Sequence, residues 1–179
     1  MDRRAFLRTT LGAAAGVAAS NALWSGKPAL AGPSTRTLRL YNVNSRDRLS
    51  IEYVVDGWYN PDAQQILDEF LRDWRTGEVH PIDPDLLDTV HAIKQELDYQ
   101  DDVHVVSAFR SRSTNNRLVR NSGAARNSYH LYGRAMDLRM PEARLRNVRA
   151  AAVGLHSGGV GYYPRSNFIH VDTGEYRTW

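Results

Sequence analysis

Two short segments near the end of the chain constrain its fold more than any other feature. Residues 128–139 read SYHLYGRAMDLR, and residues 167–172 read NFIHVD. His130 ends a polar loop, Asp137 lies in the alternating run of a predicted strand, and His170 lies in a second predicted strand. Two histidines and one carboxylate, with a fourth position free for water, are typical of a catalytic zinc site. The sequence therefore predicts a fold that brings these segments together around Zn²⁺.

The residues around the first histidine are more specific than the spacing of the ligands. The pattern Ser-x-His-x-x-Gly-x-Ala-x-Asp-Leu follows SAFRS at residues 107–111 and precedes the late-strand histidine. This combination resembles the LAS-type zinc peptidases, which have a D-alanyl-D-alanine peptidase-like or hedgehog-like fold. It is most similar to their twin-arginine-exported murein endopeptidase K group. The resemblance implies that His130, Asp137 and His170 bind zinc and that Arg110 contacts the substrate or the transition state.

Residues 1–31 resemble a twin-arginine export signal. Arg3 and Arg4 precede a weakly apolar stretch over residues 9–23, and Ala-Leu-Ala at residues 29–31 matches a small-x-small cleavage pattern. The apolar stretch is shorter than the about 20 strongly apolar residues of a membrane-spanning helix. We expect recognition by the twin-arginine machinery, cleavage after residue 31, no retained membrane span and a periplasmic protein. An uncleaved amphipathic N-terminal helix is the alternative.

Charge and cysteine content exclude several other classes. The formal net charge of +3 comes entirely from the first 31 residues, so the remainder is formally neutral and nucleic acid is not an expected partner. The chain has no cysteine, which excludes disulfides, thiolate zinc ligands and a cysteine nucleophile. Histidine and carboxylate therefore remain as the protein ligands available to zinc.

Residues 32–179 are predicted to form a single zinc peptidase domain of the α+β class. Its expected core is a small antiparallel sheet that carries the metal site and is flanked by three or four helices. Asn-Pro and Asp-Pro pairs at residues 60–61 and 83–84 are typical helix starts, with a capping side chain before a proline. Strands are expected over residues 37–43, 49–55, 103–109, 135–139 and 168–173, and helices over residues 61–74, 84–98, 111–119 and 141–156.

The general base is the point at which this chain departs from the family it resembles. Many members carry Glu or His two or three residues before the last ligand, where this chain has Phe168 and Asn167. Asp172 is the nearest substitute, because residues two apart on a strand share a face. It could instead orient His170 from behind, and both roles stay open. Arg110 suits stabilisation of the oxyanion.

The expected activity is zinc-dependent cleavage of an amide, because zinc lowers the pKa of a bound water toward about 7. Export and the resemblance together imply peptide crosslinks of peptidoglycan as the substrate, by endopeptidase or carboxypeptidase action. A non-catalytic zinc-containing module that binds cell-wall peptides is the main alternative. A structural envelope protein without metal would leave the positions of the three ligands unexplained. The tyrosines that could line a peptide groove are Tyr129, Tyr132, Tyr162 and Tyr163.

Overall fold

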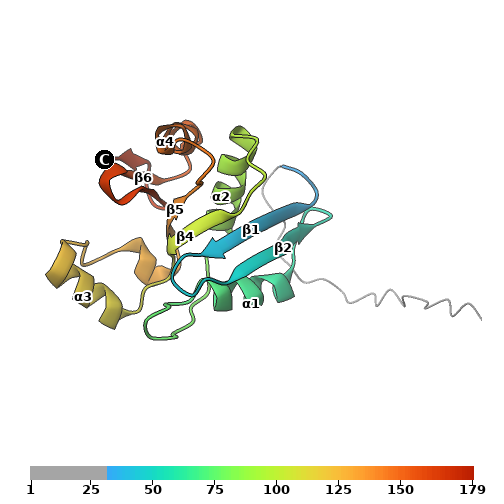
Figure 1. The fold of residues 1–179 in the computed structure, drawn as a ribbon. Helices are drawn as coiled ribbons and strands as arrows, with labels where there is room; N and C mark the ends of the chain where they lie inside the picture. The colour runs from blue at the N-terminus through green and yellow to red at the C-terminus, as the bar shows by residue number, and fades with distance from the viewer. Residues whose placement is uncertain (1–31) are drawn as a thin grey trace, which may run out of the picture.

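A computed structural model of the chain describes residues 32–179, so the predicted export signal lies outside the described residues. Within this range the backbone forms one eight-stranded sheet (Figure 1). Its strands are β1 (Arg36–Asn42), β2 (Arg48–Val55), β3 (Trp58–Tyr59), β4 (Val103–Ser107), β5 (Ala135–Arg139), β6 (Gly159–Tyr163), β7 (Phe168–Asp172) and β8 (Arg177–Thr178). The helices are α1 (Pro61–Phe70), α2 (Pro84–Glu96), α3 (Arg112–Ser122) and α4 (Leu145–Gly154), with 3-10 turns η1 (Tyr129–Tyr132) and η2 (Pro164–Ser166).

The predicted α+β class is confirmed, and the sheet extends further than the metal-site strands. Its order is β3-β2-β1-β4-β5-β7-β6-β8. The β1–β4 and β6–β8 pairs are parallel, and the other neighbours are antiparallel. A parallel pair needs a crossover connection, and α1 and α2 lie in the connection between β1 and β4. The N-terminal hairpin therefore joins the metal-site strands in one continuous sheet.

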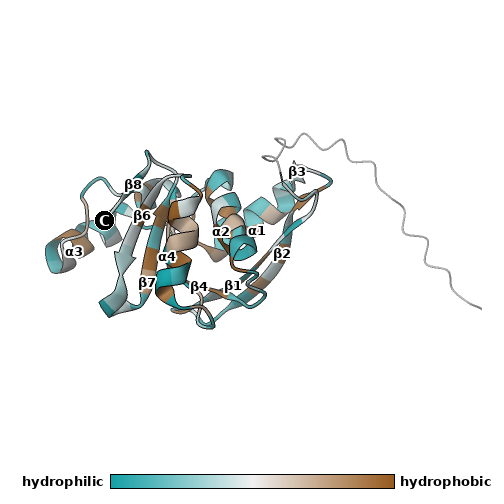
Figure 2. Cartoon of the chain, turned by 90° about the horizontal axis from the view of Figure 1, so that it is seen from above, coloured by the Kyte–Doolittle hydropathy of each residue, from teal (hydrophilic) through white to brown (hydrophobic). Residues whose placement is uncertain are grey.

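The two faces of the sheet have different chemistry. On one face α1 contacts β2, α2 contacts β1, and α4 contacts β6 and β7. Figure 2 shows these three helices as one layer, with α3 standing apart from it. Met136 and Leu138 of β5 are fully buried in the core between this layer and the sheet. Because successive strand side chains point to opposite faces, Asp137 emerges on the face away from the helices.

The predicted starts of the first two helices are confirmed. The Asn60 side chain accepts the N–H groups of Asp62 and Ala63, and the Asp83 side chain accepts that of Asp85. These bonds satisfy backbone donors that have no partner within the helix. None of the helices within residues 32–179 combines the length and apolar character needed to cross a lipid bilayer.

Helices α1 and α4 are shorter than the sequence predicts. α1 ends at Phe70 because a tight turn follows, in which the Asp73 carbonyl accepts the Gly77 N–H at 2.7 Å. Trp74, the last residue of the predicted helix, consequently lies outside α1 and is 43% exposed. α4 begins at Leu145, after a turn in which Met140 accepts the Ala143 N–H. Both differences arise from hydrogen-bonded turns that side-chain periodicity does not report.

Gly133, between η1 and β5, packs against the loop before α2. Its φ of +63° is strained for any residue with a Cβ, and a Cβ built there would lie 2.1 Å from the Pro81 carbonyl oxygen. The Gly133 carbonyl accepts the Asp83 N–H at 3.0 Å. Glycine at this position therefore allows η1 and β5 to pack against the start of α2.

Candidate metal centre

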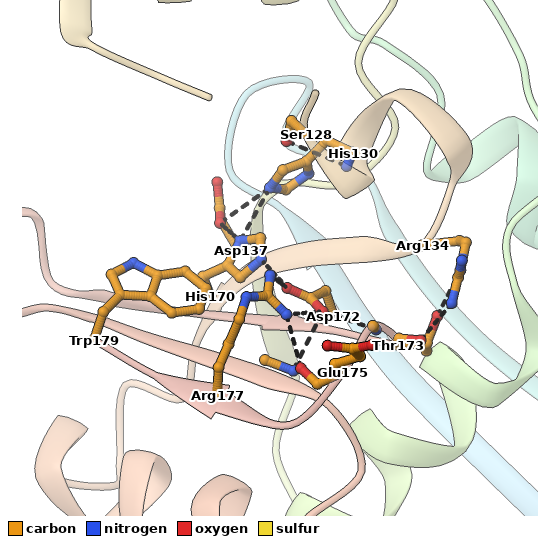
Figure 3. A network of polar contacts seen from close by, with 12 residues as sticks. Ser128, His130, Arg134, Asp137, His170, Asp172, Thr173, Glu175, Arg177 and Trp179 are labelled. Carbon is orange, nitrogen blue, oxygen red and sulfur yellow. Dashed lines mark hydrogen bonds and ion pairs between the residues drawn. The ribbon is translucent and has the colours of Figure 1, made fainter. Parts of the chain in front are cut away.

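His130, Asp137 and His170 meet on the face of the sheet that carries no helix layer. The His130 Nε2 atom lies 3.2 Å from Asp137 Oδ1 and 3.3 Å from His170 Nδ1, and the last two atoms are 2.9 Å apart. All three side chains are buried. Figure 3 shows the two imidazole rings and the carboxylate turned toward one another. The structure thus brings together the three residues that the sequence singled out.

Two features of the fold position the three side chains. Asp137 in β5 lies directly opposite His170 in β7, so the sheet register places both side chains next to one another. His130 lies in η1, which Ser128 caps by accepting the His130 N–H. The His130 carbonyl accepts the Arg110 N–H at 3.0 Å, which attaches η1 to the segment after β4.

Each histidine uses one ring nitrogen in a hydrogen bond outside the centre. The other ring nitrogen, His130 Nε2 or His170 Nδ1, faces the other two side chains and is free to bind a metal. His130 Nδ1 donates to the Ala108 carbonyl at 2.6 Å, and His170 Nε2 donates to Asp172 Oδ2 at 3.0 Å. We assign these tautomers from the hydrogen-bond partners. A carbonyl or carboxylate behind a histidine is the usual arrangement for a metal ligand, because it fixes the ring and raises the basicity of the other nitrogen.

Charge in the centre favours the metal-binding protonation state of two of the three side chains. Burial lowers the pKa of His130 and outweighs the attraction of Asp137. Burial would raise the pKa of Asp137, but the two histidines and Arg110 outweigh it and hold that pKa well below its usual range. For His170, burial alone would lower the pKa, but hydrogen bonds that the ring donates to Asp137 and Asp172 raise it. A metal ion needs neutral imidazole and ionised carboxylate, and His130 and Asp137 meet that need.

Arg110 lies beside the centre, at the end of the β4 segment. Its Nε donates to Ser107 Oγ at 2.8 Å, and its Nη2 forms an ion pair with Asp137 Oδ2. Nη1 makes no hydrogen bond within residues 32–179. The Arg110 guanidinium is paired with Asp137 Oδ2, whereas Asp137 Oδ1 faces the two histidines. A metal bound at Oδ1 would therefore lie close to the guanidinium.

Asp172 lies behind His170 and away from the meeting point of the three side chains. It is 1% exposed, and both of its oxygens are engaged. Oδ1 accepts the N–H groups of Gly159 and Gly174 at 3.2 and 2.8 Å, and Oδ2 accepts Arg177 Nη2 at 2.6 Å in addition to His170. Figure 3 shows the carboxylate between His170 and Arg177. Of the two roles that the sequence left open, this position favours orientation of His170.

The three side chains open into a cavity of about 540 Å³. Asp172 does not line it, and neither do Tyr132 and Tyr162, whereas Tyr129 and Tyr163 do. The lining residues that sequence reasoning missed include Arg75, Phe168, Arg177 and Trp179. The Trp179 ring lies 5.4 Å from the His170 ring, and its Nε1 donates to the Tyr163 hydroxyl at 2.8 Å. Only the pairing of β8 with β6 brings this tryptophan to the site, and no local pattern reports that pairing.

The donor set fits zinc. Zinc binds imidazole nitrogen and carboxylate oxygen at about 2.0–2.1 Å in a tetrahedron, so ligand atoms should be roughly 3.3 Å apart. The separations of 2.9, 3.2 and 3.3 Å match one face of such a tetrahedron. Three such ligands would leave a fourth position, which the neighbouring cavity would make accessible.

Comparison with known proteins agrees with this geometry. A family model described as peptidoglycan L,D-endopeptidase MepK matches residues 30–179. The probable peptidoglycan L,D-endopeptidase MepK of Haemophilus influenzae is 43% identical over 149 residues, which cover 82% of this chain and 80% of that protein. Peptidoglycan L,D-endopeptidase MepK of Escherichia coli K12 is 39% identical over 151 residues, covering 84% and 83%. The resemblance found in the sequence is thereby confirmed, and the chain belongs to the MepK family of M15 peptidases.

Proposed function

We propose that this protein is a zinc-dependent endopeptidase that cleaves peptide crosslinks of peptidoglycan, with His130, Asp137 and His170 as its metal ligands. The family and both relatives are described as peptidoglycan L,D-endopeptidases, which supports the reaction and the substrate class. The observation that carries the proposal is the convergence of three metal-ligating atoms at the wall of an open cavity.

Residues of the chain would orient the metal ligands and stabilise the negative charge that develops on the substrate. Bound zinc would supply Lewis-acid chemistry, acidifying a water nucleophile and polarising the amide carbonyl. Arg110 lines the cavity, and its Nη1 has hydrogen atoms to donate to the carbonyl oxygen as negative charge develops there. The Ala108 carbonyl holds His130, and Asp172 holds His170, each in the tautomer that a metal requires.

We infer that Asp172 acts by orienting His170 and not by accepting a proton from the nucleophile. The inference is supported by its position outside the cavity lining and by the four groups that already share its two oxygens. Burial would raise the pKa of Asp172, but hydrogen bonds from His170 and Arg177 lower it well below its usual range. A carboxylate stabilised in this way is a weak proton acceptor.

Incubation of the purified, zinc-loaded protein with crosslinked peptidoglycan fragments tests the function. We expect dimeric muropeptides to become monomers, with cleavage at an L,D peptide bond identified by mass spectrometry of the products. A chelator should stop the reaction and added zinc should restore it, because the nucleophile depends on the metal. Binding of the fragments without cleavage, with zinc present, would replace this proposal by the non-catalytic cell-wall-binding module.

We further propose that residues 1–31 direct twin-arginine export, so that the domain over residues 32–179 works in the periplasm. The position of peptidoglycan outside the cytoplasm supports this, as does the start of the family match at residue 30. Replacing Arg3 and Arg4 together by lysine should leave the precursor in the cytoplasm, measured by cell fractionation, whereas Arg8→Lys should have little effect. Normal maturation of the double variant would exclude the twin-arginine route while leaving another export route possible.

A further inference from the structure

Within residues 32–179 the cavity is lined by three arginines, two of which are paired with a carboxylate. Arg110 holds Asp137, as described above. Arg177 donates to both oxygens of Asp172 at 3.1 and 2.6 Å and to the Glu175 carbonyl at 2.9 Å. These two guanidinium groups therefore support the metal centre, and their charges are largely compensated.

Arg75 is different because its charge has no direct partner. Its guanidinium makes no hydrogen bond or ion pair within the described residues. The group lies over the ring of Trp74, with 4.1 Å between the guanidinium carbon and the ring centroid. Stacking on an aromatic face orients a guanidinium while leaving its N–H groups available. Arg75 therefore presents unused donors at the cavity.

The loop that carries Arg75 is fixed relative to the metal centre. Asp73 is 1% exposed, and its Oδ1 accepts the Arg75 N–H at 2.9 Å. Its Oδ2 accepts the Ser111 N–H, also at 2.9 Å. One buried carboxylate thus binds the backbone of Arg75 and that of the residue after Arg110, so the two backbone segments are held next to each other. Such preorganisation reduces the entropy that a ligand must lose on binding.

The electrostatic surroundings of Arg75 favour an anion. Burial lowers the pKa of Arg75, Asp73 opposes that effect, and repulsion from Arg110 and Arg117 adds to it. Among the described residues that line the cavity, Asp137 has the one acidic side chain, and it is paired with Arg110. The cavity therefore has an excess of positive charge, which attracts an anionic ligand.

We propose that Arg75 binds a free carboxylate of the peptide substrate, next to the amide that is cleaved. The proposal rests on the proposed function, because it assigns a substrate contact to the same cavity. Stem peptides of peptidoglycan carry free carboxylates at the chain end and on side chains. A guanidinium binds a carboxylate through two parallel N–H bonds, so Arg75 makes the enzyme prefer a free acid over the corresponding amide.

The test compares three versions of one crosslinked fragment: both carboxylates free, only the terminal carboxylate amidated, and only the side-chain carboxylate amidated. We expect Arg75→Gln to lower kcat/KM on the free acid by about 10-fold, mainly through a higher KM, the scale of a partly exposed charged hydrogen bond. The same variant should leave kcat/KM nearly unchanged on whichever amide removes the recognised carboxylate. That amide identifies which of the two carboxylates Arg75 binds.

Controls separate recognition from damage to the fold. Arg72→Gln removes a nearby arginine that binds the Glu69 carbonyl and does not line the cavity, so it should behave as wild type. Arg75→Lys should recover part of the preference because it restores the charge, and zinc content should be unchanged in every variant. Equal loss on all three fragments, or no loss on any, would overturn the proposal.

A binding measurement keeps this proposal separable from the proposed function. Calorimetry with the zinc-loaded protein should show tighter binding of the free acid than of one amide, and Arg75→Gln should remove that difference. If the protein binds the fragments with this preference but cleaves none of them, the peptidase proposal fails and the Arg75 proposal stands. If it cleaves the fragments with no preference in binding or rate, the Arg75 proposal fails alone.

Discussion

Alanine at His130, Asp137 or His170 is expected to remove most of the bound zinc and to reduce peptidase activity to background. The unaltered protein should hold about one zinc per chain, because three protein ligands and one open position make a single catalytic site. Loss of any one ligand leaves two, and the remaining side chains are held in place by hydrogen bonds or ion pairs to Ala108, Asp172 and Arg110. Metal analysis after dialysis, together with the muropeptide assay, measures both effects.

Two controls support the interpretation of these variants. His104→Ala removes a histidine of β4 that packs on Tyr41 and does not line the cavity, so zinc and activity should be retained. Asp137→Ala also leaves Arg110 without its partner. Asp137→Asn keeps the side-chain shape and an oxygen that can accept from Arg110, and it should lose zinc as well. Thermal unfolding then shows whether the fold survives. Full zinc occupancy in all three alanine variants would refute the ligand assignment.

Asp172→Asn is expected to weaken zinc binding by about 10- to 100-fold, the usual consequence of removing a carboxylate behind a ligating histidine. An asparagine in this place has one acceptor oxygen for His170, Arg177 and two backbone N–H groups, which the two carboxylate oxygens now share. His170 would lose its fixed orientation as well as basicity. Activity should fall with zinc occupancy and should recover largely when zinc is saturating.

The same variant distinguishes the two roles that the sequence allowed for Asp172. A general base would give the opposite result: zinc affinity would be unchanged, and kcat would fall by roughly 10²-fold or more even at saturating zinc. Glu175→Gln is the matched control, because it removes a charge from the same loop without touching His170. Wild-type turnover and zinc affinity in Asp172→Asn would exclude both roles.

Short sequence patterns were enough to predict the strands and helices of an α+β fold, the candidate ligands and the starts of α1 and α2. These features depend on interactions within a few residues. Asn60 and Asp83 each cap a helix that begins with a proline, and this signal is complete within four residues. In β5 and β7, strand alternation separates the core-facing residues from Asp137 and His170. A polar residue on the non-core face of a strand is therefore recognisable before the structure is known.

The direction of each side chain relative to distant segments depends on tertiary packing, and no local pattern contains it. Asp172 shares a strand face with His170, yet only the packing of Gly159, Gly174 and Arg177 around it turns its carboxylate away from the cavity. Arg75 follows a predicted helix and reaches the cavity because Asp73 binds Ser111, 38 residues further along the chain. Such contacts depend on the meeting of loops that are far apart in sequence, so alternation and helical periodicity could not predict them.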